Sequence, residues 1–168
     1  EDVAHFLFDA ASYGFTVRTV EAPFFRRVAG ARLDAPPEAS PAEHFALGPL
    51  YQQLTARLSA RLGAPTTRPK ATSAGTRDGD GILFVAHDGG VSPAGFLPVH
   101  LGNVREESVV SMYRDHPLLR SIRRADLHGR CGVCEHRWLC GGSRSRAYAA
   151  TGDPLGEDPA CAHVPASE

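Results

Sequence analysis

The 168-residue sequence has almost no net charge, with 18 Lys and Arg residues against 19 Asp and Glu residues. This balance argues against nucleic acid or an anionic membrane as a partner held by bulk electrostatics. The sequence also lacks any run near the roughly 18 apolar residues that a membrane-spanning helix needs, and it opens without an apolar secretory segment. Its 42% hydrophobic content suffices for a core. We therefore expect a soluble protein in a reducing, cytoplasmic setting, either one ordinary domain or a fragment of something larger.

Cysteine is absent from the first three quarters of the chain, and four cysteines then follow as Cys131-x2-Cys134-x5-Cys140-x20-Cys161. Four thiols with none left over make one complete coordination sphere, so these four residues are the predicted metal ligands. The first, short spacing allows a tight turn to aim two sulfurs at one point. Gly141-Gly142 allows the backbone to pass close to whatever the thiolates hold.

Three kinds of site compete for these thiols. Two disulfides need an oxidising compartment, which the missing secretory segment disfavours. Zinc accepts four thiolates, but its usual pattern is two Cys-x2-Cys pairs or a mixture with histidine, and only one such pair is present. An iron–sulfur cluster tolerates irregular spacing and accepts hydrogen bonds from glycine amides. We therefore favour a cluster and keep zinc as the alternative.

Several residues near the cysteines invite a role in the site. Trp138, inside the x5 loop, is expected to shield the cluster from water. Arg144 and Arg146 either steady the charge of an anionic cluster or face solvent in the first turn of a helix. His136 and His163 lie close to cysteines and are the two histidines to watch as ligands. The others are interpreted as surface or satisfied core residues, namely His44, His87, His100, His116 and His128.

The N-terminal pattern indicates a helix followed by a strand. Val3, Phe6, Leu7 and Ala10 have helical spacing, with Gly14 as the stop, and residues 15–20 alternate apolar and polar side chains as a strand does. A helix that feeds directly into a strand resembles the tail of a repeating βα unit, so we expect the earlier part of a larger α/β domain to be missing. Residues 21–27 then form either an active-site loop of a barrel or a solvated turn with Pro23 at the first position of a helix.

The middle and C-terminal parts alternate helices, turns and one hairpin. Helices are predicted over residues 43–62, 106–114, 117–124 and 143–150, and residues 34–41 are expected to form a loop. Residues 64–81 have no period and predict a mobile linker. Residues 82–86 are predicted to form a strand, and the turn His87-Asp88-Gly89-Gly90 that follows indicates a β-hairpin.

From Gly90 to Pro165 the sequence resembles the C-terminal auxiliary-cluster region of radical SAM enzymes of the SPASM/twitch type. The resemblance lies in Asp88-Gly-Gly-Val-Ser-Pro93, Gly95-Phe-Leu-Pro98, Gly102-Asn-Val-Arg105, Cys131-Gly-Val-Cys-Glu135, Cys140-Gly-Gly-Ser-Arg-Ser-Arg-Ala-Tyr148, Thr151-Gly-Asp-Pro154 and Glu157-Asp-Pro-Ala-Cys161. Within that superfamily the chain is most similar to the haem synthase-like and haem d1-type branch of alternative haem biosynthesis. Residues 19–27 resemble the late barrel strand of the same branch.

The resemblance implies an α/β (α+β) fold. Residues 1–63 would be the C-terminal end of a partial TIM-type barrel, residues 64–81 a linker, and residues 82–168 a small SPASM/twitch domain. It further implies that Cys131, Cys134, Cys140 and Cys161 hold an auxiliary [4Fe-4S] cluster. S-adenosylmethionine and a second [4Fe-4S] cluster would belong to the missing N-terminal part.

Two departures from the family pattern limit what this chain is expected to do. Pro93-Ala94-Gly95 stands where the fuller SPASM arrangement has Pro-Cys-Gly, which favours the single-cluster form. The Cys-x3-Cys-x2-Cys loop that binds S-adenosylmethionine in the superfamily is absent, so the chain alone is expected to be inactive. The whole enzyme would be an oxidoreductase that abstracts hydrogen from a porphyrin propionate, served by an electron donor or acceptor protein. The alternatives are a radical SAM peptide maturase and a non-enzymatic module, in which the four cysteines serve zinc binding or electron transfer.

Overall fold

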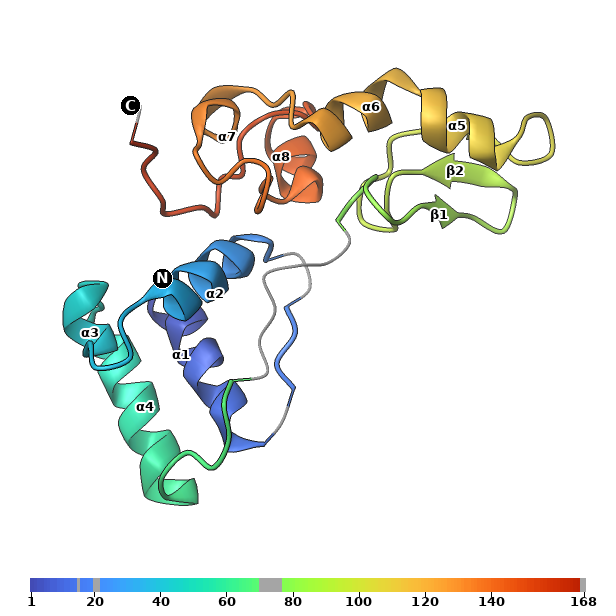
Figure 1. Ribbon diagram of the computed structural model, residues 1–168. Coiled ribbons are helices and arrows are strands. Elements are labelled where there is room, and N and C mark those ends of the chain that lie inside the picture. Colours follow the sequence, from blue (N-terminus) through green and yellow to red (C-terminus); the bar gives the residue numbers. More distant parts are fainter. Residues whose placement is uncertain (15, 20–21, 70–76, 167–168) are drawn as a thin grey trace. The chain divides into compact units, whose positions relative to one another are not determined.

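The computed structural model describes residues 1–14, 16–19, 22–69 and 77–166, and Figure 1 shows their arrangement. These described residues form two compact units, one within 1–20 and 24–74 and the other within 21–23 and 75–168. The first unit contains the helices α1 (Asp2–Ala10), η1 (Ala11–Tyr13), α2 (Phe24–Asp34), α3 (Pro41–His44) and α4 (Pro49–Leu62). The second contains β1 (Phe84–Val85), β2 (Gly90–Ser92), β3 (Gly102–Asn103), α5 (Val109–Asp115), α6 (Pro117–Arg124), α7 (Gly129–Val133) and α8 (Arg144–Thr151). The predicted mixture of helices with a small antiparallel sheet is confirmed.

In the first unit, α1 packs against both α2 and α4 (Figure 1). Its apolar face meets that of α2 in a small core made of Ala4, Phe8, Phe25, Val28 and Ala29. The helix predicted from the apolar spacing at the N-terminus is therefore confirmed. Gly14 adopts a positive φ of 90° directly after η1, which is the conformation expected of a helix stop.

The prediction of a single helix over residues 43–62 is wrong, because the helical structure is interrupted between α3 and α4. Gly48 is extended and Pro49 begins the new helix, as expected for a residue that precedes proline and for proline at the first helical position. The first free amides of α4 donate to a distant carboxylate: Gly48 N and Tyr51 N lie 2.8 and 3.2 Å from the two oxygens of Asp2. This contact fastens the start of α1 to the start of α4.

The strand predicted over residues 15–20 is also wrong where it can be checked. Residues 15 and 20 lie outside the described residues, and residues 16–19 form no strand. An extended segment becomes a strand only when a neighbour satisfies its backbone groups. The β-ladders and isolated bridges assigned among the described residues all lie in the second unit. The interpretation of this unit as part of a barrel therefore stays a prediction.

His5 provides a test of how well the first unit is packed. Its ring is 3% exposed and packs on Phe45, with 4.6 Å between the ring centroids. Burial, reinforced by the positive charge of Arg32, lowers the pKa of His5 from 6.5 to about 4. The unfolded chain therefore takes up this proton at a higher pH than the folded chain does. The stability linked to His5 is complete above about pH 6.5 and is lost as the pH falls towards 4, by at most about 1.4 kcal/mol per pH unit.

We expect an NMR titration of the histidine ring protons to show one signal with a pKa near 4. That signal should be missing in His5→Phe, which keeps an aromatic ring beside Phe45. The variant should also lose the corresponding part of the pH dependence of unfolding. If the signal removed by the substitution titrates near 6.5 in the parent, then His5 is not buried as described.

The second unit is built on a three-stranded antiparallel sheet in the order β1-β2-β3, with Phe84 opposite Ser92 and Val91 opposite Gly102. The hairpin predicted from Asp88-Gly89-Gly90 is confirmed, because Ala86 and Gly90 join β1 to β2 across that turn. The helices α5, α6 and α8 occur close to their predicted positions. The helices α5 and α6 share with the sheet a core of Val91, Leu101, Met112, Leu119 and Ile122, against which Leu155 packs from the cysteine-bearing segment. No described helix combines the length and apolar character required to cross a bilayer.

Candidate metal centre

All four cysteines lie in the second unit, and all four are free thiols. Cys131 is on the short helix α7, and Cys134 follows directly after that helix ends. Cys140 is buried just before α8, whereas Cys161 lies in the irregular C-terminal segment. The disulfide alternative therefore gains no support from the structure.

Three of the four sulfurs accept a backbone hydrogen bond from a nearby turn. His136 N donates to Cys134 Sγ, Gly142 N donates to Cys140 Sγ, and Asp158 N donates to Cys131 Sγ. The nitrogen-to-sulfur distance is 3.4 Å in each case. An N–H group aimed at sulfur stabilises the negatively charged thiolate over the neutral thiol. Backbone donors are therefore aimed at three of the four predicted ligand sulfurs.

The thiols are also close enough to influence one another. Burial raises the pKa of the Cys134 thiol, and the neighbouring acidic groups Glu135, Cys131 and Cys161 act in the same direction. Gly142 lies close to the sulfurs of both Cys140 and Cys131. Its amide donates to Cys140 Sγ, and a Cβ atom added to it would lie 3.0 Å from Cys131 Sγ. Thiol donors supported by backbone N–H groups have the donor chemistry of an iron–sulfur cluster, so these residues fit such a group, while their convergence on one centre stays a prediction.

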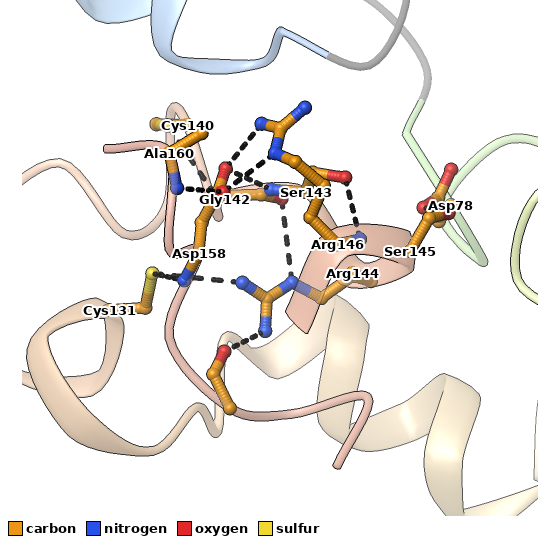
Figure 2. Close-up of polar contacts among 11 residues, drawn as sticks. Asp78, Cys131, Cys140, Gly142, Ser143, Arg144, Ser145, Arg146, Asp158 and Ala160 are labelled. Carbon is orange, nitrogen blue, oxygen red and sulfur yellow. Dashed lines mark hydrogen bonds and ion pairs between the residues drawn. The ribbon is translucent and has the colours of Figure 1, made fainter. Parts of the chain in front are cut away.

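Arg144 is 2% exposed and is the largest of the fully buried side chains. Its guanidinium donates to the carbonyl oxygens of Gly142, Pro154 and Gly156, and Nη2 lies 3.7 Å from Cys131 Sγ. Figure 2 shows the guanidinium pointing towards Cys131. Of the two sequence interpretations of Arg144, the solvent-facing one is wrong.

Asp158 is a buried carboxylate that organises the same loop (Figure 2). It accepts hydrogen bonds from Ser143 N at 2.8 Å and Ala160 N at 3.1 Å, and it pairs with Arg146, whose Nη2 lies 2.6 Å away. Burial alone would raise the pKa of Asp158, but the bonds from Arg146, Ser143 and Ala160 outweigh it and hold that pKa below 3.8. Arg146 therefore supports the loop through Asp158.

Glu135 gathers the two histidines predicted to be of interest. Its Oε1 lies 2.8 Å from His163 Nε2 and 3.6 Å from His136 Nε2. One ligand atom from each of Cys134, Glu135 and His163 falls within 4.8 Å of the others, which is a spacing that a single metal ion can bridge. This group ties the Cys134 turn to the segment that carries Cys161.

Residues 77–80, inside the segment predicted to be a linker, contact the cysteine loop. Arg77 Nη1 donates to the carbonyl oxygens of Arg137 and Trp138, and Ser145 Oγ donates to Asp78 over 2.8 Å. The two acceptor carbonyls belong to the loop between Cys134 and Cys140. The start of the second unit therefore contacts the candidate centre. The predicted division of the chain into a domain of residues 1–63, a linker of residues 64–81 and a domain of residues 82–168 stays a prediction.

The remaining sequence candidates lie elsewhere or play other roles. Trp138 is 58% exposed, so it presents much of its surface to solvent and does not form a buried cover. His116 Nδ1 accepts from Leu118 N at the start of α6, and His128 pairs with Asp153. Asp158 was missed by the sequence interpretation. Its only signal there was its place in the Glu157-Asp-Pro-Ala-Cys161 motif.

Comparison with known proteins finds relatives that match about half of this chain. The chain is 42% identical over 97 residues to the AdoMet-dependent heme synthase of Methanosarcina barkeri, which is 57% of this chain and 28% of that protein. It is 38% identical over 96 residues to the AdoMet-dependent heme synthase of Nitratidesulfovibrio vulgaris, covering 56% and 26%. The pre-heme d1 synthase of Dinoroseobacter shibae is 37% identical over 92 residues, covering 52% and 23%.

The predicted resemblance to the haem-synthase-like branch is confirmed. The chain spans between a quarter and a third of the length of the first curated relatives it matches. No protein-family model matches it. The two heme synthases are AdoMet-dependent by name, and the activity of the whole protein that contains this chain is a matter for proposal.

Proposed function

We propose that this chain is the part of a radical SAM oxidoreductase that binds an auxiliary [4Fe-4S] cluster, in an enzyme that acts on a porphyrin. Cys131, Cys134, Cys140 and Cys161 would hold the cluster, and the cluster would accept or pass on single electrons. The observation that carries the proposal is the set of three N–H···S bonds, which aim backbone donors at the sulfurs of Cys131, Cys134 and Cys140, as expected of cluster ligands.

The remaining parts of the site have consistent roles in this proposal. The turns after Cys134 and Cys140 orient those sulfurs, and the backbone N–H of Asp158 orients the sulfur of Cys131. Because these four are the only cysteines in the sequence, none is left to bind a second cluster. We therefore assign the cleavage of S-adenosylmethionine to residues outside this chain. The porphyrin substrate is supported by the names of the relatives, and a peptide substrate remains the alternative.

A second candidate is a zinc-stabilised module, which the grouping of Cys134, Glu135 and His163 favours. Zinc accepts mixed sulfur, nitrogen and oxygen ligands, so such a site would use Cys134 and His163 but would not need Cys140. In that case the protein would be colourless, and a chelator would unfold the second unit.

Single substitutions distinguish these two sites. We expect Cys131→Ala, Cys134→Ala, Cys140→Ala and Cys161→Ala each to remove most of the iron and the visible absorption after anaerobic reconstitution, because each sulfur is a ligand. His163→Ala is the control and should keep the iron, because its imidazole lies outside the predicted ligand set. If instead His163→Ala abolishes metal binding while Cys140→Ala leaves it intact, the zinc module is correct and the cluster proposal is wrong.

A further inference from the structure

The buried guanidinium of Arg144 is an unusual feature of the candidate metal centre. Removing a positive charge from water is costly unless an anion compensates it. Its hydrogen-bond partners are three neutral carbonyl groups and one cysteine sulfur, and no described carboxylate forms a salt bridge with it. The nearby Asp153 instead pairs with His128 and accepts from Leu155 N. Among the predicted metal ligands, Cys131 Sγ is the one that accepts a hydrogen bond from this guanidinium, at 3.7 Å, and the Asp153 carboxylate adds a negative charge nearby.

The carbonyl contacts hold the guanidinium in one orientation. Gly142 follows Cys140, whereas Pro154 and Gly156 belong to the turn that leads to Cys161. Because these carbonyls anchor Nε and Nη1 of the planar group, Nη2 is left to face Cys131 Sγ at 3.7 Å. Arg144 thus connects the segments that carry three of the four cysteines, and it contributes a fixed positive charge at one sulfur.

We propose that Arg144 is a positioning residue that raises the reduction potential of the cluster held by the four cysteines, through its buried charge and its N–H···S bond to Cys131. This inference rests on the proposed function. On reduction, the cluster takes one electron from an external one-electron reductant, no bond forms or breaks, and the net charge of the cluster becomes more negative by one. A fixed positive charge beside a ligand sulfur stabilises that reduced form more than the oxidised one.

The first test is a redox titration of the reconstituted full chain, with dithionite as the reductant and the reduced cluster followed by electron paramagnetic resonance. In Arg144→Gln we expect the midpoint potential to fall by at least about 59 mV, which corresponds to a tenfold change in a one-electron equilibrium. Arg144→Lys keeps the charge but loses the planar fork, so its shift should be smaller. Arg120→Gln is the matched control, because it removes one charge from an exposed position on α6 in the same unit, and its potential should equal that of the parent.

Iron and sulfide analysis separates failure of this inference from failure of the proposed function. If the parent chain binds no cluster, the proposed function is wrong and this inference falls with it. If the parent and Arg144→Gln both bind a cluster and have the same potential, only the role of Arg144 is wrong.

A second measurement covers the case in which Arg144→Gln does not fold. The parent chain is prepared with ¹⁵N-labelled arginine, and hyperfine coupling to the reduced cluster is measured. We expect a ¹⁵N coupling that disappears in Arg144→Lys. The absence of any such coupling in the parent would overturn the inference without recourse to a variant.

Discussion

Replacing Gly142 with alanine is expected to destabilise the second unit by roughly 2–5 kcal/mol and to abolish cluster binding. Gly142 has a φ of +61°, which costs an L-residue about 1–2 kcal/mol. An added methyl group would also meet Arg144 Nη2 at 2.6 Å, Asp158 Cβ at 2.9 Å and Cys131 Sγ at 3.0 Å. Relieving this crowding costs about 1–3 kcal/mol more, since none of these atoms is at the free end of an exposed side chain.

Gly152 offers a matched control for this substitution. It also has a left-handed backbone, with a φ of +77°, but an added methyl group there would meet nothing within 4 Å. Gly152→Ala should therefore cost only the conformational part, about 1–2 kcal/mol, and should keep the cluster. The free energy of unfolding from denaturant titration and the iron content would be measured for both variants. Equal losses in the two variants would mean that Gly142 is not packed against the cysteine site.

Replacing Asp158 with asparagine is expected to have the second largest effect, a loss of about 3 kcal/mol in stability. The carboxylate is 1% exposed and accepts bonds from Arg146, Ser143 N and Ala160 N. Asparagine has nearly the same shape but carries no charge, and its amide group cannot accept from Arg146 at both positions. Because Asp158 N donates to Cys131 Sγ, the variant should also bind less iron.

The neighbouring Glu157 provides the control for Asp158. Its side chain is 42% exposed and pairs with Arg130 at 3.3 Å, so Glu157→Gln should cost less than about 1 kcal/mol. Thermal unfolding and iron content of both variants would be compared. Since the pKa of Asp158 is held below 3.8, its stabilising contribution should persist above that pH and be lost only as the pH falls through the lowered value. An Asp158→Asn variant no less stable than Glu157→Gln would contradict the assigned role.

The sequence predicted best what local chemistry dictates. The hairpin at Asp88-Gly89-Gly90 depends on a glycine that accepts a positive φ, and the helix that begins at Pro117 depends on the fixed φ of proline; both were predicted correctly. The break at Gly48-Pro49 was missed because apolar spacing continued across it, although proline at the first position of a helix is itself a local signal.

The parts of the candidate site that depend on contacts between residues far apart in the sequence could not be derived from the spacing of residue types. Arg146 and Asp158 are twelve residues apart, and the turn between them decides whether they meet. The same holds for Glu135 and His163, which are separated by 28 residues. The cysteine spacing predicted a metal centre, but only the folded chain shows that the buried Arg144 and the buried Asp158 both contact the sulfur of Cys131.

The most direct test of the central claim is anaerobic purification of this chain, followed by iron, sulfide and zinc analysis with a visible spectrum. We expect a brown protein with about four irons and four sulfides per chain and no stoichiometric zinc. One zinc per chain with no visible absorption would contradict the auxiliary-cluster proposal and would identify the chain as a zinc-stabilised module.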